Sequence, residues 1–429
     1  MRRRDFLFKV AAPAAILPVT IGGLNLRAFG RTPAFEALSA TADCDDRILV
    51  LVQLVGGNDG LNTVIPLDQY SIYSAARTNI AIAEKEVIKL TDATGLHPKL
   101  GALENLYKEG HLALIQNVGY PTPNFSHFRS VDVWNTGSDY DQFLTTGWMG
   151  RYLEHVYPNY PFGYPKPEVP DPVAIQVGSI ISPVLDGTMA NLGMAFTNPA
   201  SYYDINEFES PAGKSGSSMA NESVSFIKQT GDQINKFAIP VKEAASKPMK
   251  RSPKWPTDPK NTLAPQLKIV SQLIAGGLKT KVYIVTLPGF DTHSSQNIDA
   301  GATAPHPNLL WYLSTSIAAF MDEVKLNGND HRVLGMTFSE FGRRIISNSA
   351  AGTDHGAAAP LFVFGTKVKG GIIGSNAKLP DKPTVEDNIA MQVDFRSVYS
   401  SVLKEWFCAD EASIRKVLFK DFQSLPLVA

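Results

Sequence analysis

Five apolar runs along the chain have the length and residue types of buried β-strands. Each is a nearly continuous stretch of valine, isoleucine, leucine and phenylalanine, which is typical of strands buried on both faces of a parallel sheet. The runs are residues 47–55, 112–118, 281–287, 332–338 and 360–365. Helical spacing of apolar residues predicts helices over 100–109, 264–275 and 308–326. Strands alternating with helices predict an α/β fold, a three-layer α/β/α sandwich with a mostly parallel sheet.

The pattern weakens between the second and third runs. Residues 157–172 carry six prolines and cannot form a helix, so they are expected to be an ordered loop or cap surface. Residues 210–221 are rich in glycine and serine, and 247–260 are basic and contain prolines, as in linkers. We therefore expect one domain over 43–429 with a cap-like insertion at about 155–262.

The N-terminus has a different character. Three arginines at positions 2–4 precede an apolar stretch over 10–24, which is shorter than the roughly 20 residues of a membrane span. Arg3-Arg4-Asp5-Phe6-Leu7 resembles the twin-arginine export motif of bacteria. We expect residues 1–42 to be a signal segment, read by the twin-arginine export machinery, and the mature chain to have no integral membrane span. An uncleaved amphipathic anchor is the alternative.

Charge and cysteine content narrow the function classes. The formal net charge is -1, so there is no electrostatic case for binding nucleic acid. Cys44 and Cys408 are the two cysteines, and a disulfide between them is possible in an oxidising compartment, although sequence does not establish it. Without a Cys-x-x-Cys pair, a zinc ribbon or an iron–sulfur site has no support.

Candidate chemistry lies in five short polar motifs, at 56–60, 124–128, 289–293, 339–343 and 353–356. Three of them follow predicted strands directly, and ligands of open α/β sheets bind at the carboxyl ends of the strands. The motifs supply carboxylates, imidazoles and one hydroxyl. That combination suits a divalent metal and a hydroxyl nucleophile better than a packed core.

The expected metal ligands are carboxylates and histidines: Asp59, Asp291, His293, Glu340, Asp354 and His355. Oxygen and imidazole donors fit zinc, manganese, iron or calcium. Each motif also has a plain structural interpretation. Residues 56–60 could be only a tight turn, Glu340 could pair with a neighbouring arginine, and 353–356 could be an Asx-turn with a surface histidine. His306 is a possible additional ligand.

The expected catalytic residues are Ser126, His127, Arg129 and Arg343. Ser126 could cap a helix, and the positive end of the helix dipole would also favour its alkoxide, so one residue could be both cap and nucleophile. His127 could be a ligand, a base or structural. Arg129 or Arg343 could hold an anionic group of the substrate.

Taken together, the motifs resemble those of the DUF1501 family, bacterial exported proteins of unassigned activity. The matching residues lie at 56–62, 96–100, 126–128, 289–293, 339–343 and 353–356, and the match spans about residues 47–375. That family is in turn similar to the alkaline phosphatase and sulfatase superfamily. The resemblance implies an alkaline-phosphatase-like fold with Asp59 as the early aspartate, Ser126 as nucleophile and His355 as the final histidine.

Two departures from that pattern bear on the site. Asp291 and His293 are two residues apart where the superfamily usually shows four, and Phe341 stands where a second-metal histidine is expected. We therefore expect an exported metal-dependent hydrolase of small-molecule or polymer-borne phosphate or sulfate esters, in the periplasm or cell envelope. The alternative is a non-catalytic envelope or secretion-associated binding protein with the same fold. A GDSL-like esterase is disfavoured because no Gly-Asp-Ser block precedes residue 56.

Overall fold

The computed structural model of the chain describes residues 17–21, 24–28, 44–199, 236–297 and 305–429. It divides into a small unit, Met1–Asp46, and a large unit, Arg47–Ala429. The small unit contains a short antiparallel hairpin of β1 (Leu17–Ile21) and β2 (Leu24–Ala28). Most of the expected signal segment, 1–42, lies outside the described residues, so its export role stays a prediction.

Two further sequence questions are answered by the described residues. Cys44 and Cys408, which sequence left as a possible pair, are both disulfide-bonded. In the described part of the chain, no helix is both long enough and apolar enough to cross a membrane.

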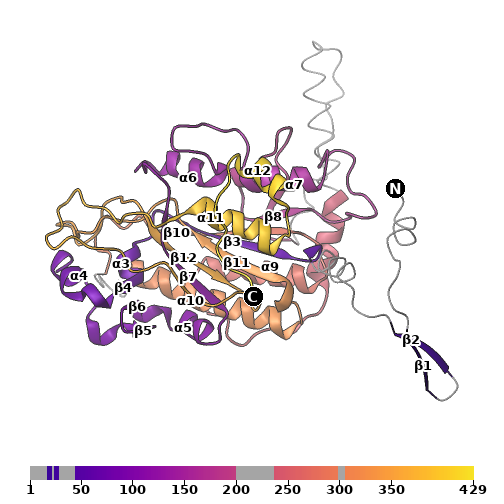
Figure 1. The fold of residues 1–429 in the computed structure, drawn as a ribbon, viewed down its shortest axis with the longest axis horizontal. Coiled ribbons are helices and arrows are strands. Elements are labelled where there is room, and N and C mark those ends of the chain that lie inside the picture. Colours follow the sequence, from indigo (N-terminus) through magenta and orange to yellow (C-terminus); the bar gives the residue numbers. More distant parts are fainter. Residues whose placement is uncertain (1–16, 22–23, 29–43, 200–235, 298–304) are drawn as a thin grey trace, which may run out of the picture. The chain divides into compact units, whose positions relative to one another are not determined.

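A nine-stranded sheet runs through the large unit (Figure 1). Its order is β13-β7-β12-β11-β3-β10-β8-β9, with β14 beside β7. β12 is antiparallel to both of its neighbours, and the other pairs are parallel. The strands are β3 (Ile48–Val55), β7 (Leu112–Gly119), β8 (Ala174–Val177), β9 (Gly193–Phe196), β10 (Val282–Pro288), β11 (Val333–Phe338), β12 (Ala359–Phe364), β13 (Gly371–Ile373) and β14 (Val393–Asp394).

Helices cover both faces of this sheet, which confirms the predicted three-layer sandwich. In Figure 1, α6, α7, α11 and α12 lie on one side and α5 and α10 on the other. α9 packs on α10. The helices are α3 (Gly60–Thr63), α4 (Tyr70–Ala76), α5 (Gly101–Lys108), α6 (His127–Thr136), α7 (Trp148–Val156), α9 (Leu263–Ala275), α10 (Pro305–Leu326), α11 (Phe395–Ser401) and α12 (Glu411–Leu418).

Shorter elements complete the large unit. A small antiparallel sheet has the order β4-β6-β5, formed by β4 (Val64–Pro66), β5 (Ile88–Lys89) and β6 (Thr94–Leu96). Single 3₁₀ turns and one π-helical turn join other elements: η1 (Leu67–Gln69), η2 (Glu84–Glu86), η3 (Pro98–Leu100), η4 (Pro183–Leu185), η5 (Asp330–Arg332) and the π turn η6 (Val402–Trp406).

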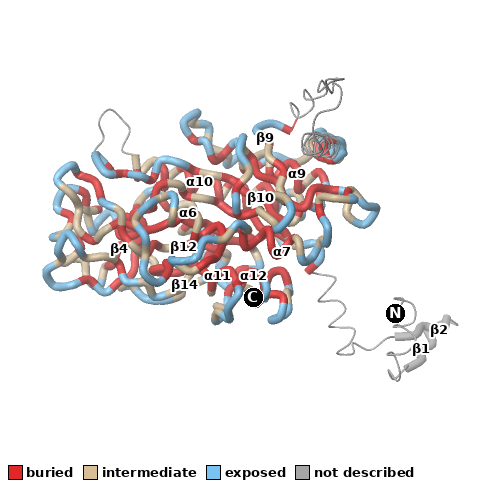
Figure 2. Tube along the Cα trace, turned by 90° about the horizontal axis from the view of Figure 1, so that it is seen from above, coloured by how far each residue is buried: buried red, intermediate tan, exposed pale blue. Residues whose placement is uncertain are grey.

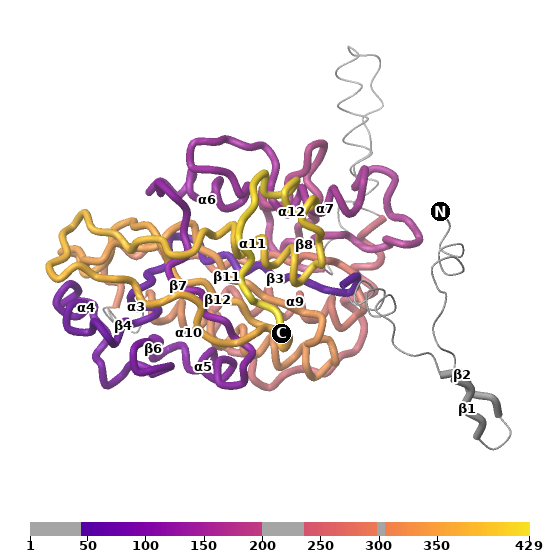
Figure 3. Tube along the Cα trace, in the orientation of Figure 1, coloured from indigo at the N-terminus to yellow at the C-terminus, as the bar shows by residue number. Residues whose placement is uncertain are grey.

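The continuous apolar runs form strands because the central part of the sheet is buried on both faces. β3 lies between β10 and β11, so sequence-distant segments are neighbours in Figure 3. In register, Leu49 is opposite both Val282 and Leu334, and all three are buried. Figure 2 shows the buried residues concentrated along the strands of the sheet. All five predicted strands and all three predicted helices are confirmed.

Part of the segment 155–262 belongs to the main sheet. β8 and β9 come from it, and both join the main sheet beside β10. Their apolar residues therefore belong to the core and not to a separate insertion. Residues 200–235, which include the glycine- and serine-rich stretch, lie outside the described residues.

The topology brings the polar motifs to one edge. The parallel strands β3, β10 and β11 end at Val55, Pro288 and Phe338, and a polar motif follows each of them. β12 runs in the opposite direction, so residues 353–356, which precede it, lie at the same edge. β7 also ends at this edge, and the chain continues from it to α6.

Candidate metal centre

Two glycines after β3 allow the loops at this edge to approach each other closely. Gly56 has a φ of 121°, and a Cβ atom there would lie 2.3 Å from the backbone nitrogen of Asp291. Gly57 has a φ of 80°, and its Cβ would lie 2.4 Å from the Phe341 ring. Only glycine fits both the backbone conformation and the space. The 56–60 motif is thus a turn chosen for its backbone.

Arg343 joins the loops through the hydrogen bonds of its guanidinium. It is 1% exposed. Its guanidinium donates to the carbonyls of Gly57 and Thr353 at 2.8 Å each, and to Asp291 Oδ1 at 2.6 Å. A buried planar fork with several acceptors holds loops in fixed positions. Arg343 therefore has a different task from the expected anion clamp, because its donors are directed at the loops.

Four side chains converge beside Arg343, namely Asp291, His127, His293 and His355. Asp291 Oδ1 lies 3.1 Å from His293 Nε2 and 3.1 Å from His355 Nε2. Asp291 Oδ2 lies 3.5 Å from His127 Nε2. The two nitrogens His293 Nε2 and His355 Nε2 are 2.8 Å apart. Donor atoms of His127, Asp291 and His355 all lie within 4.8 Å of one another, which is the spacing of a group able to hold a metal ion.

Each imidazole of this cluster has a partner that fixes its tautomer. Asp354 Oδ1 lies 3.2 Å from His293 Nδ1, Glu340 Oε1 lies 2.8 Å from His127 Nδ1, and the Phe125 carbonyl lies 2.7 Å from His355 Nδ1. Carboxylate and carbonyl oxygens only accept hydrogen bonds, so each of them favours a proton on the Nδ1 that it faces.

Three Nε2 atoms therefore converge on one carboxylate. Nitrogen and oxygen lone pairs held 2.8–3.5 Å apart repel one another unless a proton or a cation lies between them. A proton on one imidazole would relieve only its own contacts, whereas a divalent cation would coordinate all four groups. Burial also lowers the pKa of His355, although Phe125 and Asp291 act to raise it, and a lowered pKa favours the neutral imidazole that binds metals. The residues present fit a metal ion.

The cluster packs against the apolar ring of Phe341. Phe341 is buried, and its ring centroid lies 4.8 Å from that of His127 and 4.6 Å from that of His355. Burial acts to raise the pKa of Asp291, but hydrogen bonds from Arg343 and His355 outweigh it and lower the pKa to about 2. Asp291 is thus held as a carboxylate, the form that binds a cation.

Asp59 and His306 do not join the cluster. Asp59 is 0% exposed and bonds Arg77 at 2.6 Å and Gln296 at 2.5 Å. Burial acts to raise its pKa, but the charge of Arg77 outweighs it and the pKa falls below its usual value. His306 is also fully buried, with Nε2 3.0 Å from Asn58 Oδ1. The structure does not place Asp59 with the expected metal ligands, because its Oδ2 is held by Arg77 and Gln296 away from the cluster.

Glu340 and Asp354 were expected to be metal ligands, but each of them instead contacts the Nδ1 side of a cluster imidazole. Glu340 Oε1 accepts from His127 and also from the Gly56 N–H at 2.9 Å. Asp354 is partnered with His293. Carboxylates that hold the far nitrogen of a metal-binding imidazole are a common second layer of metal sites. Burial acts to raise the pKa of Asp354, but hydrogen bonds from Asn348 and His293 lower it.

The remaining sequence candidates lie on α6. Ser126 is exposed at the N-cap of α6, and its side chain makes no capping hydrogen bond. His127 begins the helix and joins the cluster. Arg129 instead turns to the loop beyond the helix, donating to the carbonyls of Asp139 at 3.0 Å and Tyr140 at 3.1 Å. It does not face the cluster.

Sequence reasoning missed three residues that orient this centre or hold the loops around it. The Phe125 carbonyl orients His355, and a backbone atom leaves no signal in the sequence. Arg77 neutralises Asp59 from the end of α4, far from any motif. Gln296 bonds Asp59 and Thr353 and so joins two loops. Its position three residues after His293 is the one available hint.

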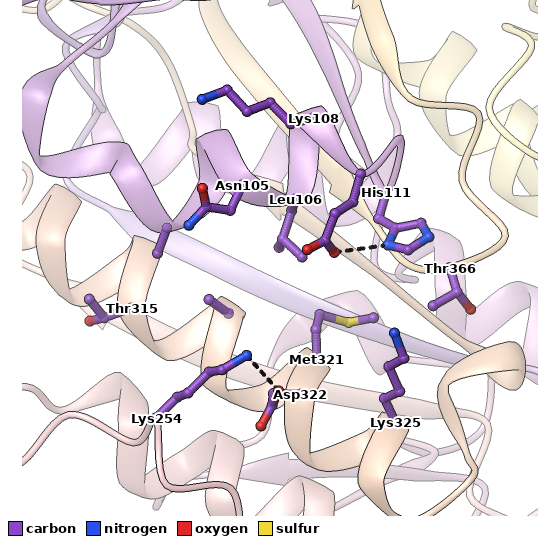
Figure 4. Close-up of a pocket in the computed structure, with 13 residues that line it drawn as sticks. Asn105, Leu106, Lys108, His111, Lys254, Thr315, Met321, Asp322, Lys325 and Thr366 are labelled. Atoms are coloured by element: carbon purple, nitrogen blue, oxygen red, sulfur yellow. Dashed lines mark hydrogen bonds and ion pairs between the residues drawn. The ribbon is translucent and has the colours of Figure 1, made fainter.

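Two cavities lie near opposite edges of the main sheet. One of about 450 Å³ lies beside the cluster, lined in part by Tyr120, Pro123, Phe125, Ile389 and Met391. Another of about 440 Å³ lies at the opposite edge, between α5 and α10 (Figure 4). There Lys254 pairs with Asp322 and His111 with Glu109, so its charges are largely matched internally.

Comparison with known proteins identifies part of the chain. Residues 271–405 match the family model described as "Protein of unknown function (DUF1501)". This confirms the recognised family over the segment that carries Asp291, His293, Glu340 and His355, while His127 lies outside it. No curated protein sequence matches the chain.

Several solved structures are similar in fold, all at low identity. The C-terminal periplasmic domain of EcEptC from Escherichia coli, in complex with zinc, is 11% identical, covers 74% of this chain and 73% of its own, and has a TM-score of 0.35. An alkaline phosphatase superfamily protein from Vibrio parahaemolyticus is 10% identical, with coverages of 88% and 70% and a TM-score of 0.39. Alkaline phosphatase from the Antarctic bacterium TAB5 is 12% identical, with coverages of 87% and 98% and a TM-score of 0.31. Similarity at this level carries no residue roles.

Proposed function

We propose that this chain, a DUF1501 protein over residues 271–405, is an exported metal-dependent hydrolase of phosphate or sulfate esters. The observation that carries the proposal is the convergence of three imidazole Nε2 atoms on the carboxylate of Asp291. Imidazole-rich sites with one carboxylate suit zinc, manganese or iron. Calcium prefers oxygen ligands and fits this set less well.

In this proposal Asp291, His127, His293 and His355 hold the ion. Glu340 and Asp354 orient two of the imidazoles and raise their basicity. A divalent ion held here supplies Lewis-acid chemistry, lowering the pKa of a hydroxyl and stabilising negative charge on ester oxygens.

Ser126 is the proposed nucleophile. Its residue is exposed, directly precedes His127 and has a hydroxyl that is not used as a helix cap. The N-terminus of α6 favours negative charge at the same place. The Ser126 oxygen would form a bond to phosphorus or sulfur as the bond to the alcohol breaks, and water would then release the acid.

The cavity beside Phe125 supports a role for the rest of the substrate. Its walls are mainly apolar, and Phe125 links it to the cluster because the Phe125 carbonyl holds His355. It would receive the alcohol portion of a small-molecule or polymer-borne ester.

Export to the periplasm or cell envelope is part of the proposal. Arg3-Arg4-Asp5-Phe6-Leu7 supports the twin-arginine route. The disulfide-bonded state of Cys44 and Cys408 suits an oxidising compartment.

Elemental analysis of the purified chain tests the metal site. We expect a near-stoichiometric transition metal in the wild type and its loss in Asp291→Ala and His355→Ala. His111→Ala, a histidine at the opposite edge of the sheet, is the matched control and should keep the metal. Ser126→Ala should keep the metal and lose turnover of para-nitrophenyl phosphate and sulfate esters. A wild type without metal after reconstitution would remove the proposal.

A non-catalytic envelope binding protein is the second candidate. One observation favours it: Arg129 and Arg343, expected to neutralise the substrate, are both engaged elsewhere. Bound metal together with no turnover in the wild type, and no effect of Ser126→Ala on ligand binding, would select this candidate.

A further inference from the structure

The charged groups of the metal centre set a limit on the charge of its ligand. Three carboxylates, Asp291, Glu340 and Asp354, contact the cluster imidazoles directly. One guanidinium, Arg343, contacts Asp291. These four side chains carry two net negative charges, and a single divalent ion brings the centre to neutrality.

The cations described near the cluster are not free to meet a substrate. Arg343 is buried and fully directed at the loops. Arg344 donates to the His355 carbonyl at 3.3 Å and pairs with Glu386 at 2.8 Å. Arg129 is directed at the 139–142 loop. Among the described residues that contact the cluster, no lysine or further arginine is available to neutralise a second ligand charge.

We infer that the centre selects singly charged esters, a sulfate monoester or a phosphodiester, over the doubly charged phosphate monoester. This inference rests on the proposed function and names its substrate class. The ion and the first-turn amides of α6 attract one negative charge. A second charge gains no cation of its own and is repelled by Asp354 and Glu340, which contact the cluster imidazoles.

Binding to the zinc-reconstituted Ser126→Ala chain tests this selection without turnover. The probes are para-nitrophenyl sulfate and bis(para-nitrophenyl) phosphate, which are singly charged, and para-nitrophenyl phosphate, which is doubly charged at mildly alkaline pH. Isothermal titration calorimetry should give a Kd at least about tenfold lower for one or both singly charged esters, about 1.4 kcal/mol. Comparing the first two probes separates a sulfate site from a phosphodiester site.

A charge variant checks the cause. Asp354→Asn keeps the side-chain shape and removes one negative charge. It should therefore narrow the difference in Kd between singly and doubly charged probes by about tenfold. Asp330→Asn, at the opposite edge of the sheet, changes the same charge and should leave the difference intact. An unchanged difference in Asp354→Asn would contradict the electrostatic cause.

The outcomes separate the inference from the proposed function. Equal or tighter binding of the doubly charged ester, or binding of none of the three, overturns the inference. The expected binding order in a wild type that turns over no ester upholds the charge selection and refutes the hydrolase. Turnover of the doubly charged ester in preference to the others upholds the hydrolase and refutes the selection.

Discussion

Replacing Glu340 with glutamine tests whether this carboxylate acts on the ion through an imidazole. Glu340 is 2% exposed, and its Oε1 accepts from His127 at 2.8 Å and from the Gly56 N–H at 2.9 Å. Glutamine has the same shape and keeps an oxygen acceptor. Glu340→Gln therefore removes a negative charge and preserves both hydrogen bonds, so His127 keeps its orientation but becomes less basic at Nε2.

The expected effect is a loss of metal affinity without a loss of the site. Replacing such an outer partner weakens metal affinity about 10- to 100-fold, which corresponds to about 1.4–2.7 kcal/mol. Competition with a chromophoric zinc chelator measures it. Glu386→Gln is the matched control, because Glu386 is an exposed carboxylate that pairs with Arg344 and contacts no imidazole of the cluster.

Two results would refute the reasoning in different ways. Unchanged zinc affinity in Glu340→Gln would mean that the charge of Glu340 does not reach the ion through His127. Complete loss of zinc, as expected for Asp291→Ala, would mean that Glu340 is itself a ligand, as the sequence suggested.

Three further predictions concern stability. Gly56→Ala should cost about 2 kcal/mol or more in urea unfolding, because its positive φ and the 2.3 Å approach to the next loop exclude a Cβ; Gly110→Ala, with a positive φ but open space, should cost about 1 kcal/mol. Arg77→Met should cost about 3–5 kcal/mol, because it leaves the buried Asp59 unpaired, and the double variant with Asp59→Leu should recover part of this loss. Burial acts to raise the pKa of Glu323, but hydrogen bonds from neighbouring side chains lower it, so its charge stabilises the fold at neutral pH and this contribution is lost as pH falls. Glu323→Gln should therefore lower the Tm at neutral pH and reduce the fall of Tm below about pH 4. A pH profile parallel to that of the wild type would contradict that assignment.

The sheet could be predicted from the sequence because its central strands are buried on both faces and leave continuous apolar runs. β8 and β9 were not predicted, because each is only four residues long and lies in the segment 155–262, where the apolar pattern is weak. The antiparallel direction of β12 could not be predicted either, because an apolar run does not indicate the direction of the strands beside it.

The site could be predicted only in outline. Residue type and position beside strands were enough to place Asp291, His293 and His355 among the candidates. They could not distinguish a group that faces the ion from a group one hydrogen bond behind it, because Asp59 and Glu340 have the same chemistry as a ligand. That distinction depends on burial and partners, which arise from packing among segments far apart in the sequence.

The dispersed origin of the donors determines the order of assembly. His127 follows β7, Asp291 follows β10 and His355 precedes β12, so the donors meet only after these strands have paired. A zinc finger folds around its ion because its ligands are close in sequence. Here the donor residues are far apart in the sequence, so an ion cannot bring them together before the sheet has formed. In the proposed function, the chain would therefore complete its fold as an apoprotein, and the compartment in which folding ends would decide which metals it meets first.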